Sequence, residues 1–241
     1  MFEDPVEEPE VFNEGGTKFT VFPIYFVVDV SQSMGRSSGG GESPIEALNR
    51  EYGDLVRELK RGPRLRQVAQ MCIISFSESA HVAVPLGDLD DDYEFSADGR
   101  TRYTRAFQLL KTQIASDMKE LAAEGRSHYR PTVFFLTDGQ PEPEDEVTAW
   151  PKFHASIVDP AFRFHPHIFA FGFGTADKDV LRRIAAGNGK VFLAEPGRSQ
   201  SEGLVKIVEQ IKYSLLNPSE GVLVVEGTPG LREIQFGDVP D

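Results

Sequence analysis

The stretch Ile24-Tyr25-Phe26-Val27-Val28-Asp29-Val30-Ser31-Gln32-Ser33-Met34-Gly35 decides the fold. Its first five residues form an unbroken apolar run, which is typical of a central strand that is covered on both faces. A carboxylate, Asp29, follows the run, and hydroxyls stand two and four residues further along, at Ser31 and Ser33. The stretch therefore predicts a buried strand that delivers oxygen ligands at its carboxyl end.

Apolar runs of the same kind alternate with amphipathic segments along the rest of the chain. Strands are expected within 68–76, 80–85, 132–136, 168–173 and 190–194, and helices within 44–60, 104–123, 145–158, 178–186 and 204–216. The strand at 80–85 follows a short turn and should pair back as an antiparallel edge. This alternation predicts an α/β fold, a three-layer, doubly wound sandwich with a mostly parallel sheet and one antiparallel edge strand.

The chain divides into a main domain and two flanking segments. Residues 1–18 are rich in Glu, Pro and Gly, which predicts a flexible acidic arm. Residues 19–216 hold the expected strands and helices. Residues 217–241 form a C-terminal tail, in which two apolar stretches flank the turn-rich segment 227–230. A small hairpin packed on the main sheet is expected there, and a strand offered to another chain is the alternative.

Composition excludes several classes of protein. Hydrophobic residues make up 40% of the chain, enough for a substantial core. No apolar run reaches the roughly 20 residues that a membrane helix needs. The formal net charge of −13 disfavours nucleic acid and anionic membrane as partners, because both reward basic patches. We therefore expect neither partner.

The single cysteine and the N-terminal residues bear on the compartment. Cys72 lies in an apolar run, where a buried free thiol is expected, and an internal disulfide is impossible. Residues 1–16 are acidic and carry neither the basic region nor the apolar run of a secretory signal. Both observations fit a reducing compartment, so we expect a cytoplasmic location.

Two later loops should bring more oxygen donors to the edge of the sheet where Asp29 lies. The strand at 132–136 ends in Thr137-Asp138-Gly139, which supplies a second carboxylate, and Asp98-Gly99-Arg100-Thr101 is a turn that leads into a helix and carries a further hydroxyl. Ligands of such sheets bind beyond the carboxyl ends of the strands. An oxygen-only set suits Mg²⁺ or Mn²⁺ better than zinc. The expected donors are Asp29, Ser31, Ser33, Thr101 and Asp138.

The segment from Val28 to Gly35 resembles the Asp-x-Ser-x-Ser signature of the von Willebrand factor A family, and the resemblance covers roughly residues 20 to 216. It implies a metal-ion-dependent adhesion site (MIDAS) in which Asp29, Ser31 and Ser33 are first-loop ligands, Thr101 the second-loop ligand and Asp138 the third-loop ligand. The family usually has Gly-Gly-Thr in the second loop, whereas Arg100 stands here before Thr101. Thr104, one turn later, therefore stays as the alternative ligand.

Three further stretches are most similar to the bacterial intracellular branch typified by TerY-like tellurium-resistance proteins. They are Pro44-Ile45-Glu46-Ala47-Leu48-Asn49, Ser75-Phe76-Ser77 and Phe134-Phe135-Leu136-Thr137-Asp138-Gly139-Gln140-Pro141. Relatives in that branch are associated with protein-kinase and phosphatase partners in stress or defence systems. The resemblance implies such partners for this chain.

The proposed ligands also predict what the site does. Three of the five donors are neutral hydroxyls, so an ion held there should attract an Asp or Glu from a partner protein. We therefore expect a metal-dependent interaction module and no enzyme. A Mg²⁺-dependent phosphatase is one alternative, although aspartyl-phosphate chemistry needs a second Asp where Ser31 stands. A scaffold with a purely structural ion is the other.

Overall fold

The computed structural model describes residues 20–37, 41–61, 68–87, 92–195, 197, 199–216 and 229–234, without the side chains of 146–148 and 216. The expected acidic arm at 1–18 and the first part of the expected C-terminal hairpin lie outside these ranges. Both stay predictions.

A seven-stranded sheet runs through the middle of the described residues, in the order β3-β2-β1-β4-β5-β6-β7. Its strands are β1 (Phe22–Asp29), β2 (Ala69–Phe76), β3 (Ala80–Val84), β4 (Thr132–Thr137), β5 (His167–Gly172), β6 (Val191–Ala194) and β7 (Leu231–Ile234). The five inner strands are parallel, whereas β3 pairs antiparallel with β2 and β7 with β6. The predicted mostly parallel sheet with an antiparallel edge is confirmed, and β7 adds a second antiparallel edge.

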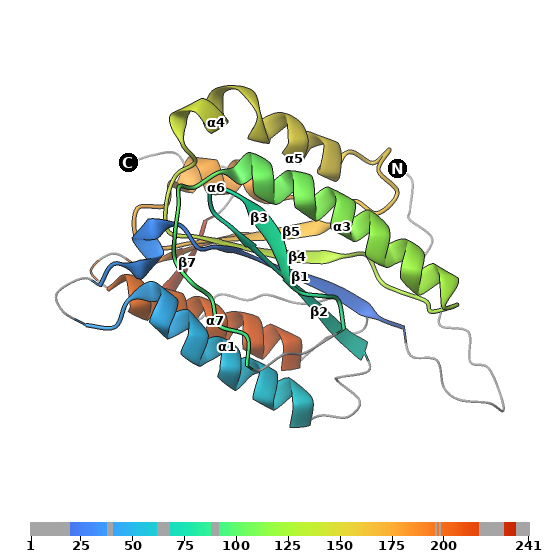
Figure 1. The fold of residues 1–241 in the computed structure, drawn as a ribbon, viewed down its shortest axis with the longest axis horizontal. Coiled ribbons are helices and arrows are strands. Elements are labelled where there is room, and N and C mark those ends of the chain that lie inside the picture. Colours follow the sequence, from blue (N-terminus) through green and yellow to red (C-terminus); the bar gives the residue numbers. More distant parts are fainter. Residues whose placement is uncertain are drawn as a thin grey trace.

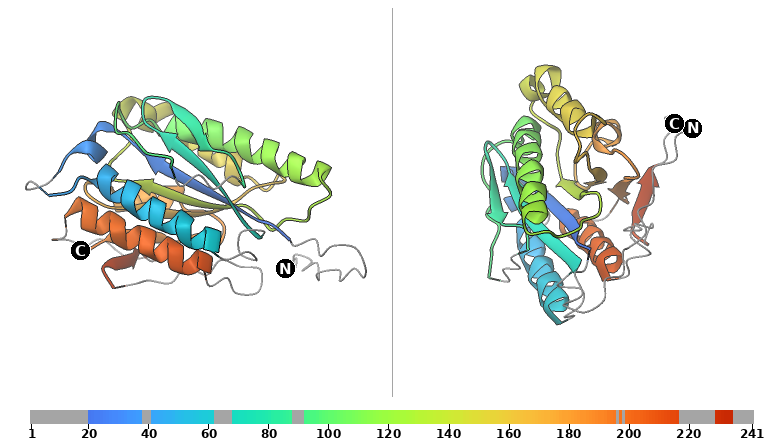
Figure 2. Two further views of the ribbon diagram at one scale, coloured as in Figure 1. Left: turned by 60° about the horizontal axis from the view of Figure 1, so that its bottom comes forward. Right: turned by 90° about the vertical axis from the view of Figure 1, so that its right-hand side faces the viewer.

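Helices cover both faces of this sheet, which confirms the three-layer prediction (Figure 1). One face is covered by α1 (Pro44–Arg61) and α7 (Gln200–Leu216), which lie side by side (Figure 2). The other is covered by α3 (Tyr103–Ala123), α4 (Pro143–Thr148), α5 (Trp150–Val158) and α6 (Lys178–Ile184). A short 3-10 helix, η1 (Gln32–Gly35), follows β1. None of the helices in the described ranges has the length and apolarity to cross a bilayer.

The apolar run of β1 is unbroken because both of its faces are buried. Ile24 and Phe26 belong to the core under α1 and α7. Tyr25 and Val27 belong to the core under α3 and α5. A strand that is enclosed in this way has no solvent-facing positions, so it shows no polar alternation.

Helix α7 starts at Gln200, four residues before the predicted start at 204. The backbone N–H of Ser199 donates to the Glu202 carboxylate at 2.9 Å, and the N–H of Glu202 donates to Ser199 Oγ at 3.2 Å. This reciprocal capping box starts the helix at Gln200. Apolar spacing alone does not detect such a start, because the capping residues are polar.

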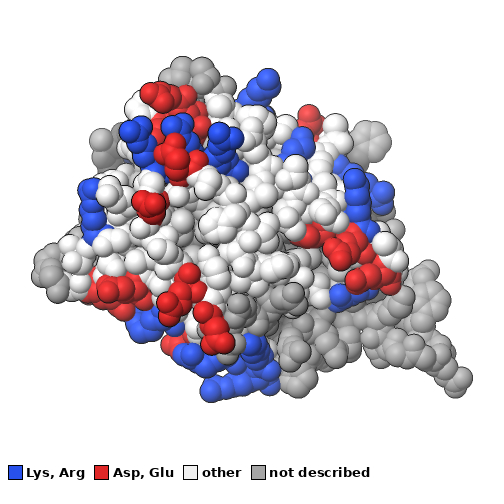
Figure 3. Space-filling model, in the orientation of Figure 1, with Lys and Arg blue, Asp and Glu red and all other residues white. Residues whose placement is uncertain are grey.

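Charged side chains form mixed groups on the face that Figure 3 shows, with an uncharged area between them. Basic residues on this face, as far as it is described, do not join into one continuous patch.

A substitution at Gly189 tests the packing between β5 and the loop before β6. A Cβ on Gly189 would lie 1.7 Å from the carbonyl oxygen of Ile168. We expect Gly189→Ala to destabilise the chain by about 1–3 kcal/mol, because backbone must move. Gly53→Ala in the interior of α1 is the control, since its Cβ would meet only the end of the Arg57 side chain, at 3.5 Å. It should stabilise by about 0.5–1 kcal/mol. Urea unfolding measures the free energy of unfolding of both variants. Equal values for Gly189→Ala and Gly53→Ala would contradict this geometry.

Candidate metal centre

Two carboxylates lie at the carboxyl ends of the neighbouring parallel strands β1 and β4. Asp29 is the last residue of β1, and Asp138 directly follows β4. The chain leaves β1 toward β2 on one side and returns to β4 on the other, so this is the switch point where ligands of open α/β sheets bind. The exposed fraction is 0% for Asp29 and 1% for Asp138. Both acids are therefore buried at this edge of the sheet.

A chain of hydrogen bonds joins the first-loop residues to both acids. The backbone N–H of Ser31 donates to Asp29 Oδ1 at 2.9 Å. The Oγ atoms of Ser31 and Ser33 are 3.1 Å apart, and the Ser33 hydroxyl donates to Asp138 Oδ1 at 3.0 Å. Four of the five predicted site residues thus form one connected group.

The second loop is held against the first by backbone hydrogen bonds. Gln32 N–H donates to the carbonyl of Gly99 at 3.0 Å, and Asp98 N–H donates to the carbonyl of Val30 at 2.9 Å. Thr101 is 8% exposed, and its Oγ1 lies 3.8 Å from where a Cβ on Gly139 would be. The Thr101 hydroxyl is therefore close to the loop that carries Asp138.

Thr104, the alternative ligand, has different contacts. Its backbone N–H donates to Asp145 Oδ2 at 3.0 Å, so Asp145 caps the start of α3 from another part of the chain. No hydrogen bond within the described ranges connects Thr104 to Asp29 or Asp138, and its buried hydroxyl has no partner there. This geometry favours Thr101, and its role as a ligand stays a prediction.

Two hydroxyls that the sequence prediction did not include lie behind the acids. The Thr137 hydroxyl donates to Asp29 Oδ2 at 2.7 Å. The Tyr103 hydroxyl is 3.1 Å from Thr137 Oγ1 and 3.0 Å from the carbonyl oxygen of Gly139. Thr137 was visible in the strand-end tripeptide, whereas Tyr103 gave no signal beyond that of a core aromatic at the start of a helix.

The two acids are electrostatically unfavourable as neighbours. Burial raises the pKa of Asp29 to about 7, and the negative charge of Asp138 contributes to the rise. Hydrogen bonds from Thr137 and Ser31 act in the opposite direction. Burial also raises the pKa of Asp138. Neither acid forms an ion pair with a Lys, Arg or His within the described part of the chain, so their charges have no internal counterion.

The donor atoms fit a hard divalent cation. Asp138 Oδ2 is buried and has no hydrogen-bond partner among the described residues, and such an oxygen costs free energy unless a donor or a cation satisfies it. The described ranges hold no group of three or more His, Cys, Asp or Glu side chains arranged for a metal. The set at this edge is instead two carboxylates with neighbouring hydroxyls, which suits Mg²⁺ or Mn²⁺.

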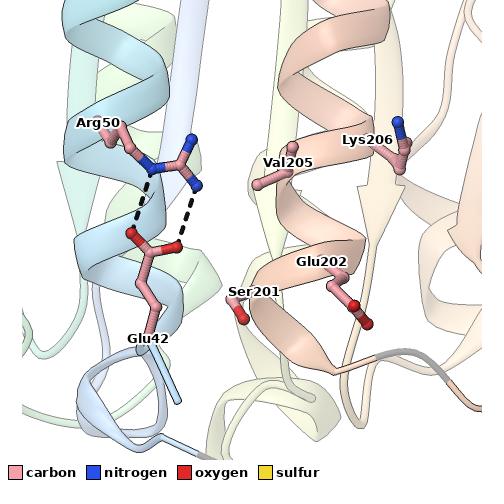
Figure 4. Close-up of a pocket in the computed structure, with 6 residues that line it drawn as sticks. All are labelled: Glu42, Arg50, Ser201, Glu202, Val205 and Lys206. Atoms are coloured by element: carbon pink, nitrogen blue, oxygen red, sulfur yellow. Dashed lines mark hydrogen bonds and ion pairs between the residues drawn. The ribbon is translucent and has the colours of Figure 1, made fainter.

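A pocket of about 250 Å³ lies between the amino ends of α1 and α7, at the same end of the sheet. Figure 4 shows its lining, Glu42, Arg50, Ser201, Glu202, Val205 and Lys206. Arg50 is paired with Glu42 at 3.0 Å, and Lys206 with Glu209 at 2.6 Å. Both cations of the pocket are therefore neutralised. Asp138 Oδ2, which has no hydrogen-bond partner among the described residues, marks a stronger candidate for a ligand site.

The fold and the site together define a class of protein, a doubly wound α/β domain with hydroxyls and two buried acids at its switch point. The sequence profile of the von Willebrand factor type A domain matches residues 24–209, and the chain belongs to this family. A search of curated proteins gave no match.

Solved structures share the fold at low sequence identity. Proximal thread matrix protein 1 from the mussel byssus is 21% identical with a TM-score of 0.57, over 81% of this chain and 46% of that one. The pilus adhesin SpaC from Lactobacillus rhamnosus GG is 12% identical with a TM-score of 0.59, over 82% and 31%. The SpRpn10 VWA domain is 11% identical with a TM-score of 0.52, over 78% and 95%. This chain thus spans less than half of the length of the mussel protein. Another structure of the mussel protein has a zinc-occupied MIDAS motif; it is 22% identical with a TM-score of 0.53, over 81% of this chain and 46% of that one.

The raised pKa of Asp29 predicts a pH dependence of the metal-free chain. The folded value, about 7, exceeds the ordinary value of 3.8, so the stability that this group contributes is present below pH 3.8 and is lost as the pH rises through 7. In EDTA, the melting temperature of Asp29→Asn minus that of the wild type should grow from pH 5 to pH 8, because Asn carries no buried charge. A difference that does not change with pH would contradict the raised pKa.

Proposed function

We propose that Asp29, Ser31, Ser33, Thr101 and Asp138 hold a Mg²⁺ or Mn²⁺ ion, and that this ion captures an Asp or Glu side chain of a partner protein. The observation that carries the proposal is Asp138 Oδ2, which is buried and has no hydrogen-bond partner in the described part of the chain. Membership of the von Willebrand factor type A family supports it. The zinc-occupied MIDAS motif of the mussel protein supports it as well, since a domain of similar fold holds a divalent ion there.

The composition of the ligand set explains why the ion would bind a partner. Mg²⁺ prefers octahedral coordination by oxygen, so five protein donors leave one position. Both oxygens of Asp29 already accept hydrogen bonds, from Ser31 and from Thr137. Most of the remaining donors are neutral hydroxyls, and an external carboxylate is therefore a favourable sixth ligand. Contacts around the ion would supply the rest of the affinity.

The finer resemblance leads to a proposal about the partner. The TerY-like stretches at 44–49, 75–77 and 134–141 favour a cytoplasmic bacterial stress or defence assembly with a protein kinase and a phosphatase. We propose that the chain is the recognition component of such an assembly and has no catalytic activity. An adhesin and a matrix protein among the structural neighbours support a binding role. Ser31, at the position where a phosphatase of the aspartyl-phosphate type needs an acid, supports it too.

Isothermal titration with Mg²⁺ and with Mn²⁺ tests the site. The wild-type chain should bind one ion, and Asp138→Ala should lose it, because the variant removes the unpartnered oxygen. Asp54→Ala is the matched control, since it deletes a carboxylate that pairs with Arg57 on the surface of α1. It should bind the ion as the wild type does. Equal binding by Asp138→Ala and the wild type would refute the assignment.

A pull-down from native lysate, with and without EDTA, tests the role. Capture should require the ion and should be lost with Asp138→Ala. If capture is the same in EDTA while Mg²⁺ still raises the melting temperature, the ion is purely structural. Release of phosphate from an aryl phosphate that needs Mg²⁺ and disappears in Asp29→Asn would instead identify a phosphatase.

A further inference from the structure

We propose that Tyr103 is the positioning residue of the metal centre: through Thr137 it orients the Asp29 carboxylate, and through Gly139 it fixes the loop that carries Asp138. The proposal rests on the function proposed above. It goes beyond the ligand set, because Tyr103 lies behind both acids.

The hydrogens of this network can be assigned one by one. The Thr137 hydroxyl has a single hydrogen, and it donates this hydrogen to Asp29 Oδ2 at 2.7 Å in preference to the Gly139 carbonyl oxygen at 3.3 Å. Thr137 Oγ1 is then an acceptor for its other neighbours. Those neighbours are the Tyr103 hydroxyl at 3.1 Å, whose single hydrogen is shared with the Gly139 carbonyl oxygen at 3.0 Å, and the Gly139 N–H at 3.3 Å. The orientation of the Thr137 hydroxyl toward Asp29 is therefore supported from behind by two donors.

Tyr103 also reaches both sides of the second acid. Thr137 and Gly139 are the two residues that flank Asp138, and the Tyr103 hydroxyl lies within hydrogen-bond distance of each. Tyr103 itself stands two residues after Thr101, at the first position of α3. One side chain thus connects the second ligand loop to the third loop directly, and to the end of β1 through Thr137.

The ring of Tyr103 holds this hydroxyl in place. The residue is fully buried, and its ring packs edge-on against Phe76, Phe135 and Trp150, with centroid distances of 5.8, 5.2 and 5.7 Å. A Phe at this position would keep the ring packing and lose only the hydroxyl. Groups that orient metal ligands in this way typically change metal affinity by about 10–100-fold when removed.

Tyr25 provides a matched control within the same core. It is also fully buried, and its hydroxyl donates to Asp117 Oδ2 at 2.8 Å. Asp117 belongs to α3 and accepts a second hydrogen bond from Gln113. None of the proposed ligands takes part in these two bonds. Tyr25→Phe therefore deletes the same group from the same core without touching a proposed ligand, and its structural cost should be at least as large, because Tyr25 donates to a carboxylate.

The experiment is a titration of Mg²⁺ and Mn²⁺ into the full chain and its variants. Tyr103→Phe should weaken ion binding by about 10–100-fold, whereas Tyr25→Phe should stay within about twofold of the wild type. Thr137→Val should reproduce the loss, and Thr137→Ser, which keeps the hydroxyl, should restore binding. Because Tyr103 acts on Asp29 through Thr137, the double variant Tyr103→Phe/Thr137→Val should bind much more tightly than the product of the two single losses predicts.

Three results would overturn the proposal. They are wild-type affinity in Tyr103→Phe, an equal loss in Tyr25→Phe, and full additivity in the double variant. Suppose that the wild type and Tyr103→Phe bind the ion equally well while Asp138→Ala does not bind it. Only this inference then fails, and the proposed function stands. If the wild-type chain binds no divalent ion, the proposed function fails, and this inference fails with it.

Discussion

The proximity of two buried carboxylates is the constraint on which the rest of this structure depends. Asp29 and Asp138 end neighbouring parallel strands, so the topology itself forces their charges together in the interior. The surrounding groups reduce the cost: the Ser31 backbone N–H, the Ser33 hydroxyl and the Thr137 hydroxyl each donate a hydrogen bond to one of the acids. Oδ2 of Asp138 still has no donor among the residues that the structure describes. Two buried acids and an oxygen without a donor cost free energy, and under the proposed function a bound cation offsets that cost.

Local patterns in the sequence predict most of the sheet and the helices, since strand burial and helix amphipathicity repeat over short distances. The meeting of Asp29 and Asp138 could also be predicted, because the carboxyl ends of parallel strands meet at one edge. Tyr103 and Asp145 could not. Their partners lie 34 to 41 residues away along the chain, and neither residue departs locally from what a core aromatic or a solvated acid would show. Sequence patterns identify the groups that face a ligand more readily than the groups that hold them.

Hydrogen bonds join the three loops of the proposed site into a single unit. Backbone hydrogen bonds join the loop after β1 to the loop before α3, and Glu142 N–H donates to the carbonyl of Thr101 at 3.1 Å, which joins the loop after β4 as well. The start of α3 receives its cap from Asp145. An ion or a partner that shifts one loop would therefore shift the others.

The last described strand extends the sheet beyond residue 216. β7 pairs with β6 through four residues, and Glu233 forms an ion pair with Lys190 across the pair. A recombinant fragment cut at 216 would leave the backbone of Val191–Ala194 with an unsatisfied edge, which is a template for unwanted association between chains. Residues 231–234 thus cover the edge of β6, and a fragment designed to stay monomeric should extend at least to residue 234.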